Sequence, residues 1–227
     1  METPGRLFIS LLGPPNVGKS TLAAKLSDEF AAAIIRPRDA IRGAIQWRPG
    51  LADLFGPVDH LGWSSDYALA FAVRLAVDAV RSRDNVLLEN LPWDVLQLLD
   101  LYRFTADAGA RLTVLLIDTP DEVLLERGSN RRVCQTCERD PSELPRRPAH
   151  AAASDPDRCA TCGGALSRRP DDSETTLVER IRRSRRYLTE MRHCASALDL
   201  PIRVIDGTSL PERIYREARD AVASIHR

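Results

Sequence analysis

The chain has 227 residues, of which 44% are hydrophobic and 5% aromatic, and its formal net charge at pH 7 is zero. This length supports one substantial α/β domain with small insertions. The neutral charge and the few aromatic residues argue against a protein that binds nucleic acid. The apolar run near the N-terminus is too short for a membrane span, and no later segment has about eighteen consecutive apolar residues. We therefore expect a cytoplasmic, monomeric protein that does not contact a membrane.

The hydrophobic pattern alternates along the chain between buried strands and amphipathic helices. Strands rich in Val, Ile and Leu are expected at residues 6–13, 85–90, 111–118 and 201–206. Helices are expected at residues 19–30, 66–83, 93–109, about 120–128, 173–195 and 211–225. Residues 37–65 are interrupted by proline and glycine and predict a small insertion. This alternation predicts an α/β fold with a parallel sheet and helices on both of its faces.

The segment GPPNVGKST fits the phosphate-loop pattern G-x-x-x-x-G-K-[ST] and lies between a predicted strand and a predicted helix. Backbone N–H groups of such a loop surround a polyphosphate, and the helix N-terminus adds positive potential. We expect Lys19 to reach the β- and γ-phosphates of ATP and the Ser20 hydroxyl to bind Mg²⁺. The alternative, a glycine turn with a fortuitous lysine, is disfavoured by the flanking strand and helix. The predicted ATP-binding loop comprises Gly13, Pro14, Pro15, Asn16, Val17, Gly18, Lys19, Ser20 and Thr21.

Four of the five cysteines form two CxxC pairs with the overall spacing C-x₂-C-x₂₁-C-x₂-C. This spacing is close to that of a four-thiolate zinc site, and the chain shows no export signal that would favour disulfides. A closed four-thiolate site has no open coordination position, so we expect Zn²⁺ in a structural role. The predicted ligands are Cys134, Cys137, Cys159 and Cys162, whereas Cys194 is expected to be a lone packed thiol.

Glu89 and Asp118 stand at the carboxyl ends of two predicted strands, where parallel sheets bind ligands. We expect Glu89 to hold Mg²⁺ through water, while the alternative for both residues is a carboxylate that caps a loop. Several arginines gather around the cysteine pairs, and bidentate guanidinium contacts suit the charge of a transferring phosphoryl group. These arginines are Arg127, Arg131, Arg132, Arg168, Arg169 and Arg180.

In this order the motifs resemble the adenylate kinase family, in its form with a zinc-bearing lid. The resemblance covers nearly the whole chain and is strongest at GPPNVGKST, ERGSNRRVCQTC, CATCGGALSRRPDDSETTLVERIRRS and VIDGT. It implies a P-loop NTPase fold with a small acceptor-binding insertion and a zinc-bearing lid. The implied divisions are core with the phosphate loop at 1–36, acceptor insertion at 37–65, core at 66–130, zinc lid at 131–170 and core at 171–227.

The resemblance also implies roles for the arginines and for residues near the C-terminus. Arg127 and Arg131 would lie on the ATP side of the lid. Arg169 and Arg180 would stabilise the transferring phosphoryl group, and together with Lys19 these arginines form the predicted catalytic set. Lid closure would involve Asp171 and Asp172, and the backbone of Gly207–Leu210 would border the adenine.

The acceptor side matches the family less closely. The segment RDAIR contains Asp39 and resembles the family's segment that ends in a phosphate-binding arginine, here Arg42. Gln97 stands where the family has a glutamine that reads the base of the monophosphate. The family's acidic-Gly-Phe-Pro-Arg run is Glu-Asn-Leu-Pro-Trp in this chain, so Trp93 replaces an arginine that binds the acceptor phosphate.

Two explanations of this replacement remain open. A substitute guanidinium could come from Arg38 or Arg48, or Trp93 could stack on a base or on an acceptor that is not a nucleotide. The first expected function is therefore ATP- and Mg²⁺-dependent phosphoryl transfer to a nucleoside monophosphate, with adenylate kinase activity as the default. The second is a P-loop kinase for another nucleotide, a nucleoside or a metabolite. The third is a nucleotide- or nucleic-acid-binding protein without kinase activity.

Overall fold

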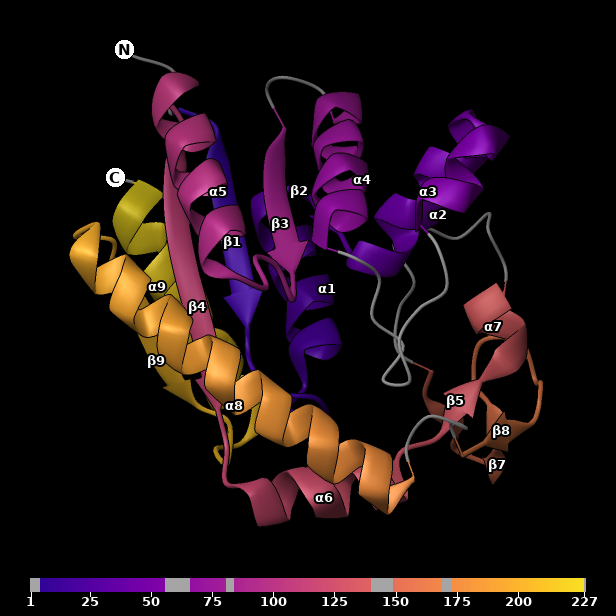
Figure 1. Ribbon diagram of the computed structural model, residues 1–227. Helices are drawn as coiled ribbons and strands as arrows, with labels where there is room; N and C mark the ends of the chain where they lie inside the picture. Colours follow the sequence, from indigo (N-terminus) through magenta and orange to yellow (C-terminus); the bar gives the residue numbers. More distant parts are fainter. Residues whose placement is uncertain (1–4, 56–65, 81–83, 140–148, 169–172, 227) are drawn as a thin grey trace.

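The computed structural model describes residues 5–55, 66–80, 84–139, 149–168 and 173–226. Its centre is a five-stranded parallel sheet in the order β2-β3-β1-β4-β9 (Figure 1). The strands are β1 (Leu7–Leu12), β2 (Ala32–Ile35), β3 (Asn85–Glu89), β4 (Arg111–Asp118) and β9 (Ile202–Asp206). A parallel sheet joined by helical crossovers is the α/β fold class that the sequence predicts.

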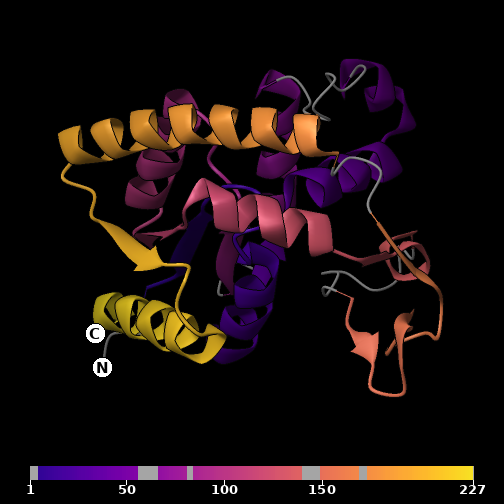
Figure 2. The same ribbon diagram turned by 90° about the horizontal axis from the view of Figure 1, so that it is seen from below.

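Helices cover both faces of this sheet (Figures 1 and 2). One face packs against α1 and α9, joined by Leu177 and Ile181 at the start of α8, and the other packs against α4, α5 and the rest of α8. The bounds are α1 Lys19–Phe30, α4 Asp66–Ala79, α5 Val95–Asp107, α8 Glu174–Ala197 and α9 Pro211–His226. Among the described helices, none combines the length and the apolar character that crossing a membrane requires.

The central strand β1 serves two separate cores, because successive side chains of a strand point to opposite faces of the sheet. Leu7, Ile9 and Leu11 pack with the apolar residues of α1 and α9. Phe8 packs with residues of α4, and Leu12 packs with residues of α5 and α8. All six side chains of β1 are buried, so the loop that follows this strand begins from a rigid point.

The edge strand β2 is not predicted by the sequence pattern. Its four residues, AAII, follow α1 after a single residue, Ala31, whose φ of 47° turns the chain in the left-handed conformation. The Asn85 side chain fastens this edge, because its amide donates to the Phe30 carbonyl at 2.8 Å and its Oδ1 accepts from the Leu7 N–H at 2.9 Å. The strand matters for function because Arg36 follows directly at its carboxyl end.

Two smaller parts extend from the sheet on the same side of the molecule, one above the other in Figure 1. The upper part is built from the helices that follow β2: α2 Pro37–Trp47, the 3₁₀ helix η1 Pro49–Leu51 and α3 Ala52–Phe55. The lower part, here named the cysteine-rich module, comprises residues 131–139 and 149–168 and follows α6 (Asp121–Asn130). Its elements are β5 Val133–Cys134, α7 Gln135–Arg139, β6 Ala151–Ala152, β7 Asp155–Cys159 and β8 Leu166–Ser167.

The predicted domain boundaries stay predictions. The proposed insertion at 37–65 and the proposed lid at 131–170 correspond to these two parts, but residues 56–65, 140–148 and 169–170 lie outside the described residues. What the structure does place is the carboxyl edge of the sheet, from which the chain enters α2 after β2 and α6 after β4. Ligands of open parallel sheets bind beyond this edge.

Candidate active site

The phosphate loop joins β1 to α1 and has the backbone geometry that its glycines permit. Gly13 has a φ of 151°, and a Cβ at this position would lie 2.7 Å from the Ile117 carbonyl oxygen. Gly18 has a φ of 99° and forms the N-cap of α1. Because a side chain at either position would be strained or would collide, the loop depends on glycine there. Its backbone N–H groups precede a helix N-terminus, the arrangement that binds phosphate.

Lys19 bends over this loop. Its Nζ donates hydrogen bonds to the carbonyl oxygens of Gly13 and Pro14, both at 2.7 Å. The pKa of Lys19 is lowered from 10.5 to about 8, chiefly by burial; the carboxylate of Glu89 acts to raise it and the charge of Arg131 to lower it. The ammonium group is therefore held at the loop in a place where charge is costly, and a polyphosphate would offset that cost.

A cavity of about 940 Å³ opens in front of the phosphate loop. Among the described residues, eight cationic side chains and three carboxylates line it, so positive charges exceed negative ones by five there, in a chain whose net charge is zero. The cationic residues are Lys19, Arg36, Arg38, Arg42, Arg127, Arg131, Arg132 and Arg180, and the acidic ones are Asp39, Glu89 and Glu126. Such a concentration of positive charge suits a ligand that carries several phosphates.

Glu89 lies between the phosphate loop and Arg36. Its Oε1 accepts a hydrogen bond from the Ser20 hydroxyl at 2.5 Å, and its Oε2 accepts one from Arg36 Nε at 2.6 Å. The Glu89 residue is buried, with 6% of its surface exposed. A hydroxyl and a carboxylate at hydrogen-bond distance are oxygen ligands of the kind that Mg²⁺ takes beside a nucleotide's phosphates. The predicted magnesium residues, Ser20 and Glu89, thus stand together at the cavity wall.

The predicted phosphoryl-binding arginines come from three directions onto the same cavity. Arg127, on α6, donates through Nη2 to the Gly207 carbonyl at 3.0 Å. Arg131 follows α6 and donates through Nη1 to Asn16 Oδ1 of the phosphate loop at 3.3 Å. Arg180 reaches the cavity from α8.

Three further residues of that prediction, Arg169, Asp171 and Asp172, lie outside the described residues. Arg132 lines the cavity as well, whereas the exposed Arg168 is not among the lining residues. Within the phosphate loop, every predicted residue except Pro14 borders the cavity. Gly207 is not part of the lining, but the hydrogen bond to Arg127 places its carbonyl oxygen next to that arginine.

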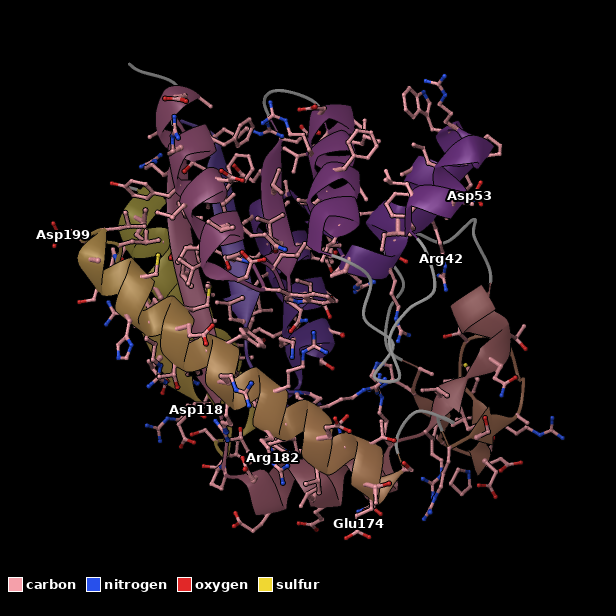
Figure 3. The ribbon with its side chains drawn as sticks, in the orientation of Figure 1. Arg42, Asp53, Asp118, Glu174, Arg182 and Asp199 are labelled. Atoms are coloured by element: carbon pink, nitrogen blue, oxygen red, sulfur yellow. The ribbon has the colours of Figure 1, made fainter. Side chains whose placement is uncertain are left out.

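The acceptor-side residues are brought together only in part. Asp39, Arg42 and Trp93 line the cavity, and Asp39 lies 3.6 Å from Arg42 Nη1. In Figure 3 the Arg42 side chain extends from α2 in the direction of the cysteine-rich module. Gln97 is not among the lining residues: its Oε1 accepts the Trp93 N–H at 2.9 Å, and its own N–H donates to the Asp94 carboxylate at 2.8 Å. Gln97 therefore shapes the loop that carries Trp93.

Arg36 and Tyr187 are cavity residues that sequence reasoning does not find. Arg36 lies at the end of β2, the strand that the hydrophobic pattern misses, so nothing indicates that it stands beside Glu89. Tyr187 is buried, lines the cavity and lies 3.5 Å through its hydroxyl from the Gly13 carbonyl. Burial raises the pKa of Tyr187, so its hydroxyl stays protonated at neutral pH. Arg36 could have been found only by recognising the short strand before RPRD.

Asp118 serves the fold rather than the cavity, in line with the loop-capping alternative. Its carboxylate forms an ion pair with Arg185 of α8 and accepts from Arg192 Nη2 at 3.3 Å. Arg185 also bonds the Thr119 carbonyl and donates to Asp121 at 2.7 Å. Asp118 is not among the cavity residues, and Figure 3 shows it near the middle of α8, away from Arg42. This arginine cluster joins α8 to the end of β4 and the start of α6.

The four predicted metal ligands converge in the cysteine-rich module. The Sγ atoms of Cys134, Cys137, Cys159 and Cys162 all lie within 4.8 Å of one another. The antiparallel pair β5–β8 brings Cys134 close to the second CxxC pair, and Sγ of Cys134 lies 3.4 Å from Sγ of Cys162. All five cysteines are free thiols, and Cys194 stands apart on α8. Among the described residues, this cluster is the one group of three or more Cys, His, Asp or Glu side chains whose ligand atoms could together hold a metal ion.

Local backbone geometry makes the cluster fit a zinc ion. The backbone N–H groups of Cys162 and Thr161 lower the pKa of Cys159 to about 6, and that of Cys137 chiefly lowers the pKa of Cys134. Both effects favour the thiolate form that binds zinc, whereas hydrogen bonds with neighbouring thiols raise the pKa of Cys137 and of Cys162. The Gly164 N–H donates to Cys162 Sγ at 3.4 Å, and a Cβ on Gly164 would lie 3.2 Å from that sulfur. The turn is thus shaped around sulfur atoms, which is compatible with a structural Zn²⁺.

Comparison with known proteins agrees with this geometry. A family model described as an AAA domain matches residues 8–153, which is more than half of the chain. The adenylate kinase of Kosmotoga olearia is 31% identical over 178 residues, covering 77% of this chain and 80% of that protein. That of Caldicellulosiruptor saccharolyticus is 30% identical, covering 75% and 78%. The chain belongs to the adenylate kinase family.

The alignment with another member of the family extends over nearly the whole chain. The adenylate kinase of Clostridium acetobutylicum is 28% identical over 235 residues, covering 96% of this chain and 99% of that protein. The protein is therefore a P-loop phosphotransferase that acts in nucleotide-dependent phosphoryl transfer. This membership replaces the expectation of a nucleotide- or nucleic-acid-binding protein without kinase activity.

Proposed function

We propose that the protein transfers the γ-phosphoryl group of ATP to a nucleoside monophosphate. The observation that carries this proposal is the shared cavity: the phosphate loop, the arginines of α6 and α8, and the Arg36–Glu89–Asp39 wall all border one space. Two phosphate-bearing substrates can therefore meet in it. The names of the relatives support adenylate kinase activity as the first assignment, with AMP as the acceptor.

The proposed mechanism depends on positioning and on charge neutralisation, since a phosphate oxygen is already a nucleophile. Lys19 and the N-terminus of α1 hold the β- and γ-phosphates. Arg127, Arg131 and Arg180 share the charge that spreads over the transferring group. Ser20 and Glu89 would hold Mg²⁺, which when bound neutralises phosphate charge and orients the phosphates.

The cysteine-rich module has a structural part in this proposal. With zinc on its four thiolates, the module would hold β5 and the arginines that precede it against the cavity. Arg131 and Arg132 stand directly before β5, and Cys134 and Cys137 themselves border the cavity. Movement of this module over ATP would exclude water from the phosphoryl group and prevent hydrolysis.

The acceptor is tested by measuring ADP formation from ATP with a panel of nucleoside monophosphates and the matching nucleosides. We expect AMP to be phosphorylated and adenosine not to be. A second candidate acceptor is kept for a specific reason: Trp93 borders the cavity where the resemblance expects an arginine. Turnover of a nucleoside or another alcohol, with none of any monophosphate, would replace the first assignment by a kinase with a different acceptor.

The role proposed for the arginines that contact the transferring phosphoryl group is tested separately with Arg180→Ala. Because Arg180 reaches the cavity from α8 and no other described residue of that helix adds a positive charge there, its loss should lower kcat by about 10² to 10⁴-fold. Arg182→Ala is the matched control, since Arg182 is exposed on the same helix and does not line the cavity. A kcat for Arg180→Ala within threefold of that of Arg182→Ala would reject this role.

A further inference from the structure

The guanidinium of Arg36 lies in the cavity wall with only part of its hydrogen-bonding capacity used. Its Nε donates to Glu89 Oε2 at 2.6 Å, and its Nη1 lies 3.8 Å from Asp39 Oδ2. Its Nη2 is buried and has no hydrogen-bond partner among the described residues. The side chain is 14% exposed, so little water reaches it. A buried charged donor without an acceptor is costly, and the structure keeps one at this position.

The surroundings of Arg36 offer few other acceptors. Arg36 follows Ile35, which belongs to the same apolar cluster as Leu69, with Ile41 and Trp93 packed against it. The last three residues also line the cavity, and none of their side chains has an oxygen atom. Glu89 already accepts from Ser20 as well as from Arg36, and Asp39 is shared with Arg42. Among the described residues Arg36 Nη2 thus lacks an acceptor, and an anionic ligand in the cavity that Arg36 lines would supply one.

We propose that Arg36 divides its guanidinium between the two substrate sites. Nε stays on Glu89, the carboxylate beside the phosphate loop, while Nη2 binds an anionic oxygen of the acceptor, which is a phosphate monoester. This inference rests on the proposed function and names the residue that selects an anionic acceptor. The guanidinium fork suits the task because its N–H groups point in fixed directions, whereas a lysine offers one compact charge. Arg36 then supplies the guanidinium for which the sequence suggests Arg38 or Arg48.

If Arg36 binds the acceptor phosphate, an arginine is not needed at position 93, and Trp93 can stand there. Trp93 and Arg36 border the same cavity, so an aromatic surface and a cation are both available to a nucleotide. Arg42 stands across Asp39 from Arg36, and its Nη1 lies 3.6 Å from Asp39 Oδ1. A phosphate held by Arg36 would therefore lie within a wall that contains a second guanidinium. A neutral alcohol would leave Arg36 Nη2 without an oxygen of negative charge, and the site would discriminate against it.

The decisive measurement is binding of AMP by isothermal titration calorimetry in the absence of ATP and Mg²⁺. Without metal, the contribution of Glu89 to the magnesium site does not enter the result. We expect Arg36→Ala to weaken AMP binding about 10- to 100-fold, the loss typical of one charge-assisted hydrogen bond, and to change adenosine binding less than threefold. Arg219→Ala is the control, because Arg219 lies on α9 and pairs with its neighbour Asp220 at 2.8 Å.

A second variant, Arg36→Lys, distinguishes the loss of a phosphate contact from a loss of structure. The lysine ammonium can still neutralise the Glu89 carboxylate, so the local structure should be kept. We expect this variant to keep the ATP KM of the unsubstituted protein within threefold and to raise the AMP KM at least fivefold. Equal effects on both KM values would indicate a structural role and overturn the inference. Unchanged AMP binding in both variants, with AMP still phosphorylated, would overturn it while leaving the proposed function intact.

The two proposals fail in different ways. If the unsubstituted protein binds adenosine as tightly as AMP and phosphorylates it, the anionic acceptor is wrong, and so is the role of Arg36. If AMP binds and depends on Arg36 but no monophosphate of the panel is phosphorylated, the Arg36 site stands and the proposed reaction is wrong. Should none of AMP, GMP, CMP and UMP bind, both proposals are overturned.

Discussion

At the scale of single residues, the cavity places cationic groups where they are most costly without an anion. Lys19 is the plainest case, since its ammonium is buried against two backbone carbonyls. Arg36 is held by the neighbouring Glu89 carboxylate, and Arg131 is held by Asn16 of the phosphate loop. These contacts fix the positions of the charges before a nucleotide arrives, so a smaller reorganisation is needed when it binds.

The lowered pKa of Lys19 predicts that ATP binding weakens at alkaline pH. Below pH 8 the side chain is protonated and attracts phosphate; above it the free protein loses that charge, while bound phosphates favour the charged form. The Kd for ATP should rise on the order of tenfold between pH 7.5 and pH 9. Calorimetric titrations across this range measure it. Lys19→Arg, which stays charged, should give a nearly flat profile, and an equally steep one would contradict the assignment.

The sequence predicts most of the residues at the ATP end of the cavity, because each belongs to a local motif. The phosphate loop and the two CxxC pairs have fixed spacings that chemistry demands. Arg36 and Arg185 could not be predicted in the same way. Their partners Glu89 and Asp118 are 53 and 67 residues away, so each pair depends on strand order and helix direction. Gln97 differs from both, because its Oε1 accepts the Trp93 N–H and supports the loop that carries Trp93, while its predicted role in reading the base stays a prediction.

At the scale of secondary-structure elements, the cysteine-rich module differs from the rest of the chain in how it is stabilised. Its strands β5, β6 and β8 have two residues each, and most of its described side chains are not buried. Such short elements bury too little apolar surface to fold by themselves. A metal ion bound by the cysteine cluster at their centre would supply the stability that the small core does not.

Removing one ligand of the cluster is therefore expected to unfold the module. Cys134→Ser should reduce bound zinc from about one ion per chain to a small fraction and should expose the module to limited proteolysis, because metal binding and folding are coupled. The thiol Cys134 is buried at the cluster, whereas Cys194 lies on α8. Cys194→Ser is the matched control and should retain the metal. Equal zinc content in the two variants would show that the cluster is not a metal site.

The contacts of Arg185, which connect α8 to the end of β4 and the start of α6, lead to a second prediction at this scale. Arg185 pairs with Asp118 and Asp121 and bonds the Thr119 carbonyl, so Arg185→Ala removes several charge-assisted hydrogen bonds. One third of its side chain is exposed, which reduces their worth. We expect urea denaturation to show a loss of about 1–2 kcal/mol in the free energy of unfolding. The exposed Arg182 serves as control. A comparable loss of unfolding free energy for Arg182→Ala would show that the Arg185 contacts do not explain the effect.

At the scale of the whole molecule, the distribution of charge matters more than its sum. The chain is neutral, yet the described lining of the cavity has five more positive than negative charges. The compensating carboxylates must therefore lie mostly elsewhere on the protein. A localised positive field draws in small polyanions, while a neutral overall charge gives a long polyanion such as DNA little to bind.

Salt should accordingly weaken nucleotide binding without promoting any contact with nucleic acid. Raising KCl from 50 to 500 mM is expected to increase the Kd for Mg·ATP roughly fivefold, because added ions screen the field at the cavity mouth. Adenosine, which carries no phosphate, should bind equally well at both concentrations and is the internal control. A DNA duplex should not displace a fluorescent ATP analogue at either salt concentration. Displacement of the ATP analogue by the duplex would instead indicate that the cavity binds nucleic acid.

The overall architecture is the feature that the sequence predicts best. Alternating apolar strands and amphipathic helices specify a parallel sheet with two covered faces, and four of the five strands have hydrophobic runs long enough to be recognised. The missed strand, β2, has four residues at the sheet edge next to α1, which leaves it no run of its own. The positions of α2 and α3 and of the cysteine-rich module relative to the sheet depend on tertiary contacts that no local pattern encodes.

Cys134 and Cys137 belong both to the cysteine cluster and to the lining of the cavity. A change at the cluster therefore acts on the cavity directly, through these two side chains. With zinc as the ion at this cluster, a shortage of zinc in the cell, or an oxidant that attacks the thiols, would directly weaken the binding of ATP. Phosphoryl transfer by this protein would then follow the cell's metal supply as well as its nucleotide pools.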